Sequence, residues 1–259
     1  MKIGIVGCGN LGKSLSKGIL LRNEHRIFAS KRNQTAKDAA LESDTFSWVD
    51  NHTLISESDL IIIALKPFAV LPFLAEYSAS FDPEKHTLIS VASSITSVQV
   101  FDTLGYELDF FRAMPNTAAG VTESITAIAP IRDVKNKKTV VFSLFNSIGT
   151  TIELNEELME AATIIGACGI AYVLRFMRAM IQGGIEVGFD SKTATQIVAQ
   201  TMKGAAELII KNNTHPEEEI DKVTTPKGCT IVGLNTMEHS GFSSSLIKGI
   251  VASYKKIEK

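Results

Sequence analysis

The sequence predicts an α/β domain built on a doubly wound, mostly parallel sheet, followed by an all-helical domain. Two observations predict this order. Up to residue 154, short runs of apolar and β-branched residues alternate with helical patterns, which is typical of a parallel sheet with helical crossovers. After Asn155 no further strand pattern occurs, and helical periodicity dominates the remaining sequence.

The expected strands are short, and one of them, residues 60–64, is apolar at every position. That pattern indicates a strand covered by helices on both faces. Strands are expected at residues 2–6, 26–29, 60–64, 87–91, 108–112, 125–129 and 150–153. Helices between them are expected at residues 12–22, 69–77 and 133–147.

The second half begins at Asn155, because Asn155 followed by Glu156 and Glu157 is typical of a capped helix start. We therefore expect an α/β domain over residues 1–154 and a helical domain over residues 155–259. Helices are expected at residues 156–165, 171–183, 191–211, 216–222 and 230–256. Several of them are apolar on more than one face, so we expect self-association through this domain, as a dimer or a multiple of dimers.

Composition narrows the possible partners and compartments. A formal net charge of −2 gives no electrostatic footprint for nucleic acid. The three cysteines are far apart and lack metal-ligand spacing, so neither a disulfide framework nor a metal site is expected. The apolar stretch near Met1 is short and interrupted by glycine, and no run approaches the roughly 20 apolar residues of a membrane span. We expect a cytoplasmic protein that binds neither membranes nor nucleic acid.

The first expected strand leads directly into Gly7-Cys8-Gly9-Asn10-Leu11-Gly12 and then into a helix. In this setting the first glycine allows a tight turn, the second lets the backbone approach a pyrophosphate, and the third permits close helix–strand packing. The sequence therefore predicts a dinucleotide-binding, Rossmann-type domain; a glycine-rich turn of another βα unit is the alternative. The expected cofactor residues here are Gly7, Gly9, Asn10, Leu11 and Gly12.

The second expected strand ends in Ser30-Lys31-Arg32, where an NAD-selective site usually carries an acidic residue. Two cations and a hydroxyl suit a 2′-phosphate instead. A solvated basic turn is the alternative. We expect NADPH as the cofactor, with NADH possible but weaker, and Ser30, Lys31 and Arg32 as contacts of the 2′-phosphate.

Three further motifs follow in order: Lys66-Pro67, Met114-Pro115-Asn116-Thr117 and Thr224-Thr225-Pro226-Lys227-Gly228-Cys229-Thr230. Together with the glycines, they make the whole chain resemble the pyrroline-5-carboxylate reductase family, the NADPH-linked enzymes that make proline. The resemblance implies hydride transfer to the C=N carbon of 1-pyrroline-5-carboxylate. Because the protonated imine is already electrophilic, such a site must orient the reactants more than it must supply a strong acid.

The resemblance also implies residue roles. The Thr230 hydroxyl would contact the imine nitrogen, and the amides of Gly228 and Cys229 would hold the carboxylate beside the Thr225 hydroxyl. A turn in which Thr230 merely caps the next helix is the alternative. Further cofactor contacts are implied at the nicotinamide and ribose side and near the adenine: Ala64, Lys66, Pro67, Asn116 and Asn51.

The chain departs from the family pattern at several positions. Ser94 and Lys227 stand where glycine is usual, and residues 166–172 lack the serines and proline common at the start of the helical domain. Substrate scope therefore stays open. One alternative is a β-hydroxyacid dehydrogenase, but Arg175 stands near the position of its catalytic lysine, and guanidinium scarcely deprotonates. The other alternative is a catalytically weak NADPH-binding sensor or scaffold.

Overall fold

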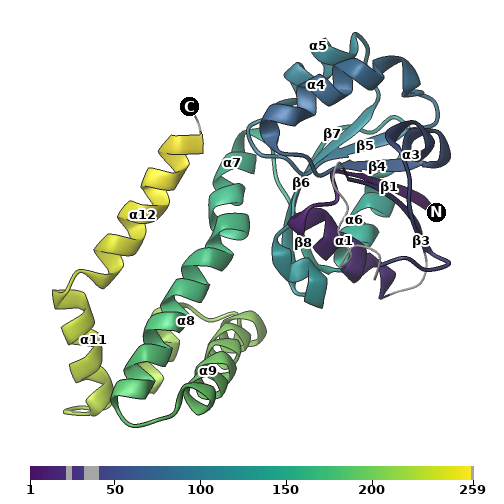
Figure 1. Cartoon of the computed structure of the whole chain (residues 1–259). Helices are drawn as coiled ribbons and strands as arrows, with labels where there is room; N and C mark the ends of the chain where they lie inside the picture. Colours follow the sequence, from purple (N-terminus) through teal and green to yellow (C-terminus); the bar gives the residue numbers. More distant parts are fainter. Residues whose placement is uncertain (22–24, 32–40, 258–259) are drawn as a thin grey trace. The chain divides into compact units, whose positions relative to one another are not determined.

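The computed structural model describes residues 1–21, 25–31 and 41–257. The chain divides into two compact units (Figure 1). Unit 1 comprises Met1–Cys168 with Tyr254–Lys259, and unit 2 comprises Gly169–Ser253. The functional boundary expected after Leu154 stays a prediction.

Unit 1 contains one sheet, whose described strands lie in the order β3-β2-β1-β4-β5-β6-β7-β8. All neighbouring pairs are parallel except β6 and β7. The strands are β1 (Lys2–Val6), β2 (Arg26–Ser30), β3 (Phe46–Trp48), β4 (Leu60–Ile63), β5 (Thr87–Ser90), β6 (Asp109–Met114), β7 (Ser124–Arg132) and β8 (Gly149–Glu153). The expected doubly wound, mostly parallel sheet is confirmed; β3 is an addition to the expected strands.

Helices cover both faces of this sheet (Figure 1). They are α1 (Asn10–Leu20), α3 (Asn51–Glu57), α4 (Pro67–Tyr77), α5 (Ser97–Leu104) and α6 (Lys138–Asn146), with short 3₁₀ turns η1 (Ser78–Ser80) and η2 (Thr117–Val121). Along β4, Leu60 and Ile62 join the core beneath α1 and α6, whereas Ile61 and Ile63 join the core beneath α3, α4 and α5. This alternation explains why every residue of β4 is apolar.

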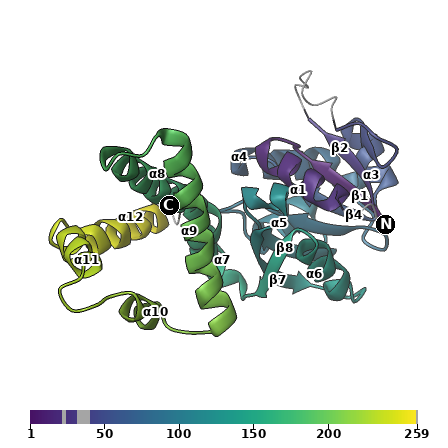
Figure 2. The ribbon, with the colours of Figure 1, turned by 90° about the horizontal axis from the view of Figure 1, so that it is seen from below.

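After β8 the chain continues through η3 (Glu156–Leu158), α7 (Met159–Ala162) and a π-helical turn, η4 (Thr163–Cys168). Unit 2 then contains α8 (Gly169–Glu186), α9 (Ser191–Asn212), α10 (Pro216–Lys222), α11 (Cys229–His239) and most of α12 (Phe242–Ile257). Figure 2 shows α10 as a separate short helix between α9 and α11. The single helix expected over residues 230–256 is wrong. The chain breaks at Gly241, whose φ of +82° is left-handed and so ends a right-handed helix.

One described segment, Glu156–Glu186, is long and apolar enough to cross a membrane by length and composition, with a mean hydropathy of 1.6. This corrects the expectation that no run comes close to that limit. Few of its residues are buried within the chain itself. The absence of a membrane partner stays a prediction.

Candidate cofactor and substrate site

The glycine turn after β1 has the geometry of a phosphate-binding turn. Gly7 has a φ of +83°, and the N–H groups of Gly7 and Cys8 donate to the Ser30 carbonyl at 3.1 and 2.9 Å. A Cβ on Gly12 would lie 3.2 Å from the Gly7 carbonyl oxygen, so glycine permits α1 to approach this closely. Gly9 provides no side-chain cap, and the first turn of α1 carries no acidic residue. The amides at this helix start suit an anion.

A cavity of about 480 Å³ lies beside this turn. It brings together four of the expected cofactor residues, Gly7, Ser30, Lys31 and Asn51. The Asn51 Nδ2 donates to the Tyr77 hydroxyl at 3.3 Å, which fixes the amide in the wall. Arg32 lies outside the described residues.

Asp50 also lines the cavity and is not among the cofactor residues expected from the sequence. It caps α3: Oδ1 accepts the Thr53 N–H at 2.9 Å, and Oδ2 accepts the Thr53 hydroxyl at 2.8 Å. These hydrogen bonds lower the pKa of Asp50 below its ordinary value. Both oxygens are therefore engaged by α3. The strand β2 ends in Ser30 and is followed by Lys31, so no carboxylate stands at its end, which suits a 2′-phosphate. An aspartate three residues before Thr53 is a recognisable N-cap signal, and it could have located the start of α3 from the sequence.

Four other expected cofactor residues, Ala64, Lys66, Pro67 and Asn116, follow the strands β4 and β6. In the sheet β4 lies beside β1, and β6 lies beside β5, so these residues leave the carboxyl edge of the sheet. Ala64 continues the ladder, since its N–H donates to the Val6 carbonyl at 2.8 Å. Lys66 is exposed and precedes α4, with Pro67 as the first helical residue. Asn116 is buried: its Oδ1 accepts the Ala118 N–H, and its Nδ2 donates to the Gly166 carbonyl, both at 3.0 Å. The Asn116 side chain thus holds its own turn, and a cofactor contact by Asn116 stays a prediction.

The expected substrate residues meet at the start of α11 in unit 2. Gly228 N–H donates to the Thr225 carbonyl at 2.9 Å, closing a turn in which Lys227 has a φ of +59°. A Cβ on Gly228 would lie 2.6 Å from Thr225 Oγ1 and 3.0 Å from the Thr225 carbonyl oxygen, so a side chain at this position would crowd the turn. Gly228 is the N-cap residue, without a side-chain cap, and Cys229 is the first residue of α11. Thr230 therefore lies inside the helix, and the alternative that it serves as the N-cap is wrong.

The two groups of residues lie in different compact units: the expected cofactor residues in unit 1 and the expected substrate residues in unit 2. A glycine turn at the start of α1, a cationic end of β2 and an appended helical domain define an NAD(P)-dependent oxidoreductase with a Rossmann-type domain. Two family models match within the chain. Residues 2–94 match "NADP oxidoreductase coenzyme F420-dependent", and residues 156–259 match "Pyrroline-5-carboxylate reductase dimerisation".

Similar proteins agree with this class. Pyrroline-5-carboxylate reductase 2 of Dictyostelium discoideum is 37% identical, over 99% of this chain and 92% of the relative. The reductase of Methanosarcina acetivorans is 30% identical, over 98% of this chain and 96% of the relative. Pyrroline-5-carboxylate reductase 1 of Dictyostelium discoideum is 40% identical over 98% of this chain, which spans about half (49%) of that relative's length. The chain belongs to the pyrroline-5-carboxylate reductase family.

A solved structure adds the cofactor class. The crystal structure of Plasmodium falciparum pyrroline carboxylate reductase with NADP bound superposes with a TM-score of 0.90 at 27% identity, covering 99% of this chain and 97% of that chain. The predicted family and fold class are confirmed, and the NADP bound to that relative agrees with the expected cofactor. The match to the dimerisation domain supports self-association through residues 156–259, which include the apolar segment Glu156–Glu186.

Proposed function

We propose that this protein reduces 1-pyrroline-5-carboxylate to L-proline with NADPH as the hydride donor. The observation that carries the proposal is a pair of helix starts. The helices α1 and α11 each begin after glycine, without a side-chain cap and without an acid in the first turn. By contrast, α3, α5, α9 and α10 are N-capped by the side chains of Asp50, Thr96, Asp190 and His215. The helices α4 and α6 also lack a side-chain cap, but each begins after a lysine rather than a glycine. One open start suits a pyrophosphate and the other a substrate carboxylate.

In the proposed reaction NADPH, when bound, supplies the hydride. The turn between Gly7 and Gly12 holds the pyrophosphate, and Lys31 with Arg32 pairs with the 2′-phosphate. The amides of Gly228 and Cys229 orient the carboxylate. The protonated imine donates its N–H to the Thr230 hydroxyl, accepts hydride at carbon and becomes the secondary amine of proline. No group of the protein has to lose a proton in this step.

The reaction is tested by following NADPH oxidation with 1-pyrroline-5-carboxylate in wild type and Thr230→Ala. Loss of an orienting contact should lower kcat by about 10- to 100-fold while the Kd for NADPH stays within about twofold. Thr236→Ala is the matched control, because Thr236 is an exposed threonine of α11 whose hydroxyl donates back to the Val232 carbonyl of the same helix. An equal loss of NADPH affinity in Thr230→Ala contradicts the assigned role. Tight NADPH binding by a wild type that does not consume NADPH supports the sensor alternative.

The cofactor preference is tested by replacing Lys31 and Arg32 together with alanine. Loss of charge-assisted contacts to the 2′-phosphate should raise the Kd for NADPH by about 10- to 100-fold and leave the Kd for NADH nearly unchanged. Lys17→Ala removes an exposed charge of α1 and should change neither value. Equal weakening of NADPH and NADH would remove the basis for the 2′-phosphate contact.

The assembly and compartment belong to the same proposal: a dimer or a multiple of dimers, in the cytoplasm and without a membrane partner. Supporting the assembly, a groove of about 500 Å³ lies between α8 and α12 within unit 2. It is lined mainly by apolar residues, including Val173, Phe176 and Leu246. Such a surface matches a second copy of a chain that carries this dimerisation domain.

A further inference from the structure

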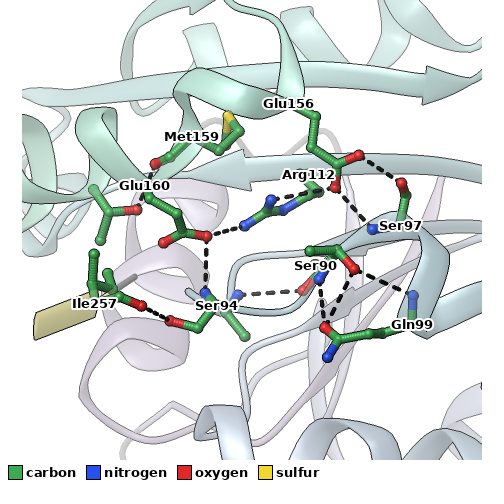
Figure 3. Close-up of polar contacts among 12 residues, drawn as sticks. Ser90, Ser94, Ser97, Gln99, Arg112, Glu156, Met159, Glu160 and Ile257 are labelled. Carbon is green, nitrogen blue, oxygen red and sulfur yellow. Dashed lines mark hydrogen bonds and ion pairs between the residues drawn. The ribbon is translucent and has the colours of Figure 1, made fainter. Parts of the chain in front are cut away.

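Arg112 forms the centre of a charged cluster within unit 1 (Figure 3). It comes from β6, and its side chain is only 3% exposed. Its Nη1 lies 3.3 Å from Glu156 Oε1, and its Nη2 lies 2.7 Å from Glu160 Oε1. A buried guanidinium needs such partners, because an unpaired charge is costly to desolvate.

Each glutamate also contacts the chain that follows β5. Glu156 accepts the N–H and the hydroxyl of Ser97, the first residue of α5. Glu160 Oε1 accepts the Ser94 N–H at 3.0 Å. Figure 3 shows both glutamates pointing from the α7 region toward this segment. The two carboxylates share one arginine but hold different residues.

Ser94 has an unusual backbone for a serine, with a φ of +60°. A left-handed conformation costs free energy in every residue that has a Cβ, and only glycine adopts it without that cost. The Ser94 hydroxyl also donates to the Ile257 carbonyl at 3.4 Å, at the end of α12 that belongs to unit 1. The hydrogen bond from Ser94 N–H to Glu160 therefore supports a strained residue.

The hydrogen bond from Ser94 N–H to Glu160 affects how the Glu160 carboxylate pairs with Arg112. Across the described parts of the chain, neither Arg112 Nε nor Glu160 Oε2 has a hydrogen-bond partner. A side-on arginine–carboxylate pair would use both oxygens. Here a single oxygen, Oε1, accepts from Arg112 and from Ser94 together. The Glu160 carboxylate is thus oriented to accept the Ser94 N–H, and it does not form a two-point ion pair with Arg112.

The position of Ser94 gives this contact a functional meaning. The segment 91–96 leaves the carboxyl end of β5, and β5 lies between β4 and β6 in the sheet. Ligands of doubly wound sheets bind outside this edge. We propose that Glu160 is a positioning residue: it holds Ser94 left-handed and so fixes the loop that faces the nicotinamide half of NADPH. This inference rests on the proposed function in placing the cofactor along that edge.

A rescue experiment separates positioning from general stability. Glu160→Ala should lower kcat for NADPH oxidation by about tenfold, because the left-handed state loses its support. Adding Ser94→Gly should restore most of that loss, since glycine needs no such support. Glu156→Ala is the matched control, because it also removes a carboxylate from Arg112 but leaves the contact between Ser94 and Glu160. Adding Ser94→Gly to Glu156→Ala should therefore not raise kcat. Rescue of both variants, or of neither, overturns the proposal.

Two further readouts keep the proposal testable when Glu160→Ala folds poorly or when the imine is not the substrate. Glu160→Gln retains a carbonyl acceptor and should keep kcat and the Kd for NADPH within about threefold of wild type. In the cofactor-free protein, hydrogen exchange of the Ser94 amide should be at least about tenfold faster in Glu160→Ala and unchanged in Glu156→Ala. A wild type that does not oxidise NADPH with the imine contradicts the proposed function alone; an unchanged Ser94 amide in Glu160→Ala contradicts the positioning role alone.

Discussion

Unit 1 and unit 2 differ in how they bury apolar surface. In unit 1, Phe110, Phe111 and Phe145 have no exposed surface, and two large cores lie on opposite faces of the sheet. In unit 2, the buried hydrophobic residues are Ile181, Ala194 and Val198, between α8 and α9. Large apolar side chains of unit 2 remain exposed: Leu174, Ile210, Val232 and Ile247. Unit 1 thus has its own core, whereas the exposed apolar faces of unit 2 agree with self-association through the matched dimerisation domain.

Glycines show the same difference. In unit 1, a Cβ on Gly18 would lie 2.3 Å from the Ala119 carbonyl oxygen, and one on Gly149 would lie 1.9 Å from the Ser124 carbonyl oxygen. In unit 2, Cβ atoms on Gly183 and Gly233 would meet nothing within 4 Å. Close packing in unit 1 therefore excludes larger residues at Gly18 and Gly149, whereas the surroundings of Gly183 and Gly233 in unit 2 are open within a single chain.

The largest change in the free energy of unfolding is expected when glycines of the two units are replaced by alanine. Gly18→Ala should destabilise unit 1 by about 3 kcal/mol or more, since the new methyl group meets backbone on a fixed neighbour. Gly183→Ala, in the open interior of α8, should instead stabilise the helix by about 0.5–1 kcal/mol. Urea unfolding curves measure both changes. Equal losses at the two positions would contradict the difference in packing.

The next effect concerns self-association. Leu246→Glu places a charge in the groove of unit 2 and should raise the dissociation constant of the assembly about thirtyfold, or about 2 kcal/mol. Val134→Glu is the control, because Val134 is 67% exposed on unit 1. Sedimentation measurements should show lighter particles for Leu246→Glu only. An unchanged mass for Leu246→Glu would mean that this groove lies outside the interface.

A smaller effect is expected in the substrate turn of unit 2. Lys227 has a φ of +59°, so Lys227→Gly should raise the free energy of unfolding by about 1 kcal/mol. Lys227→Ala keeps the strain and should give no such gain. Thermal unfolding of the two variants distinguishes backbone strain from loss of the lysine charge, and equal shifts would point to the charge.

The smallest expected effect is on the pH dependence of unit 1. Burial, followed by the nearby Lys85 charge, lowers the pKa of His86 below its ordinary value of 6.5. Below pH 6.5 the unfolded chain therefore binds a proton that the folded chain rejects, and stability falls as pH falls. His86→Asn keeps an acceptor for the Asp82 N–H. Between pH 7 and 5, the free energy of unfolding should fall less in this variant than in wild type, by about 1 kcal/mol or less. Unfolding curves with equal pH slopes in both proteins would contradict this role.

Much of the fold could be predicted from local patterns, since buried strands such as β4 are apolar at every position. The short elements β3 and α3 lack enough residues for a clear period. The helix α5 was missed although Thr96 and Gln99 form a capping box and Gly105 ends the helix left-handed, and these signals are present in the sequence. The break at Gly241 was missed because a lone glycine inside a helical pattern is only a weak signal.

The site was predictable where its chemistry depends on adjacent residues, as in the glycine turn and the Thr225-to-Thr230 loop. The Arg112 cluster was not predictable, because Glu156 and Glu160 lie 44 and 48 positions from Arg112 and meet it only through the fold. Nor could the sequence show that the Asn116 side chain is engaged by Ala118 and Gly166. Contacts of this range depend on tertiary packing, which leaves no local pattern.

In the proposed function, unit 1 binds the hydride donor and unit 2 binds a cyclic imine that accepts the hydride. The most direct test supplies NADPH deuterated at both C4 positions together with 1-pyrroline-5-carboxylate, and locates the label by NMR. We expect proline carrying one deuterium on the former imine carbon. Proline without deuterium, or deuterated NADPH that is not consumed, would contradict it.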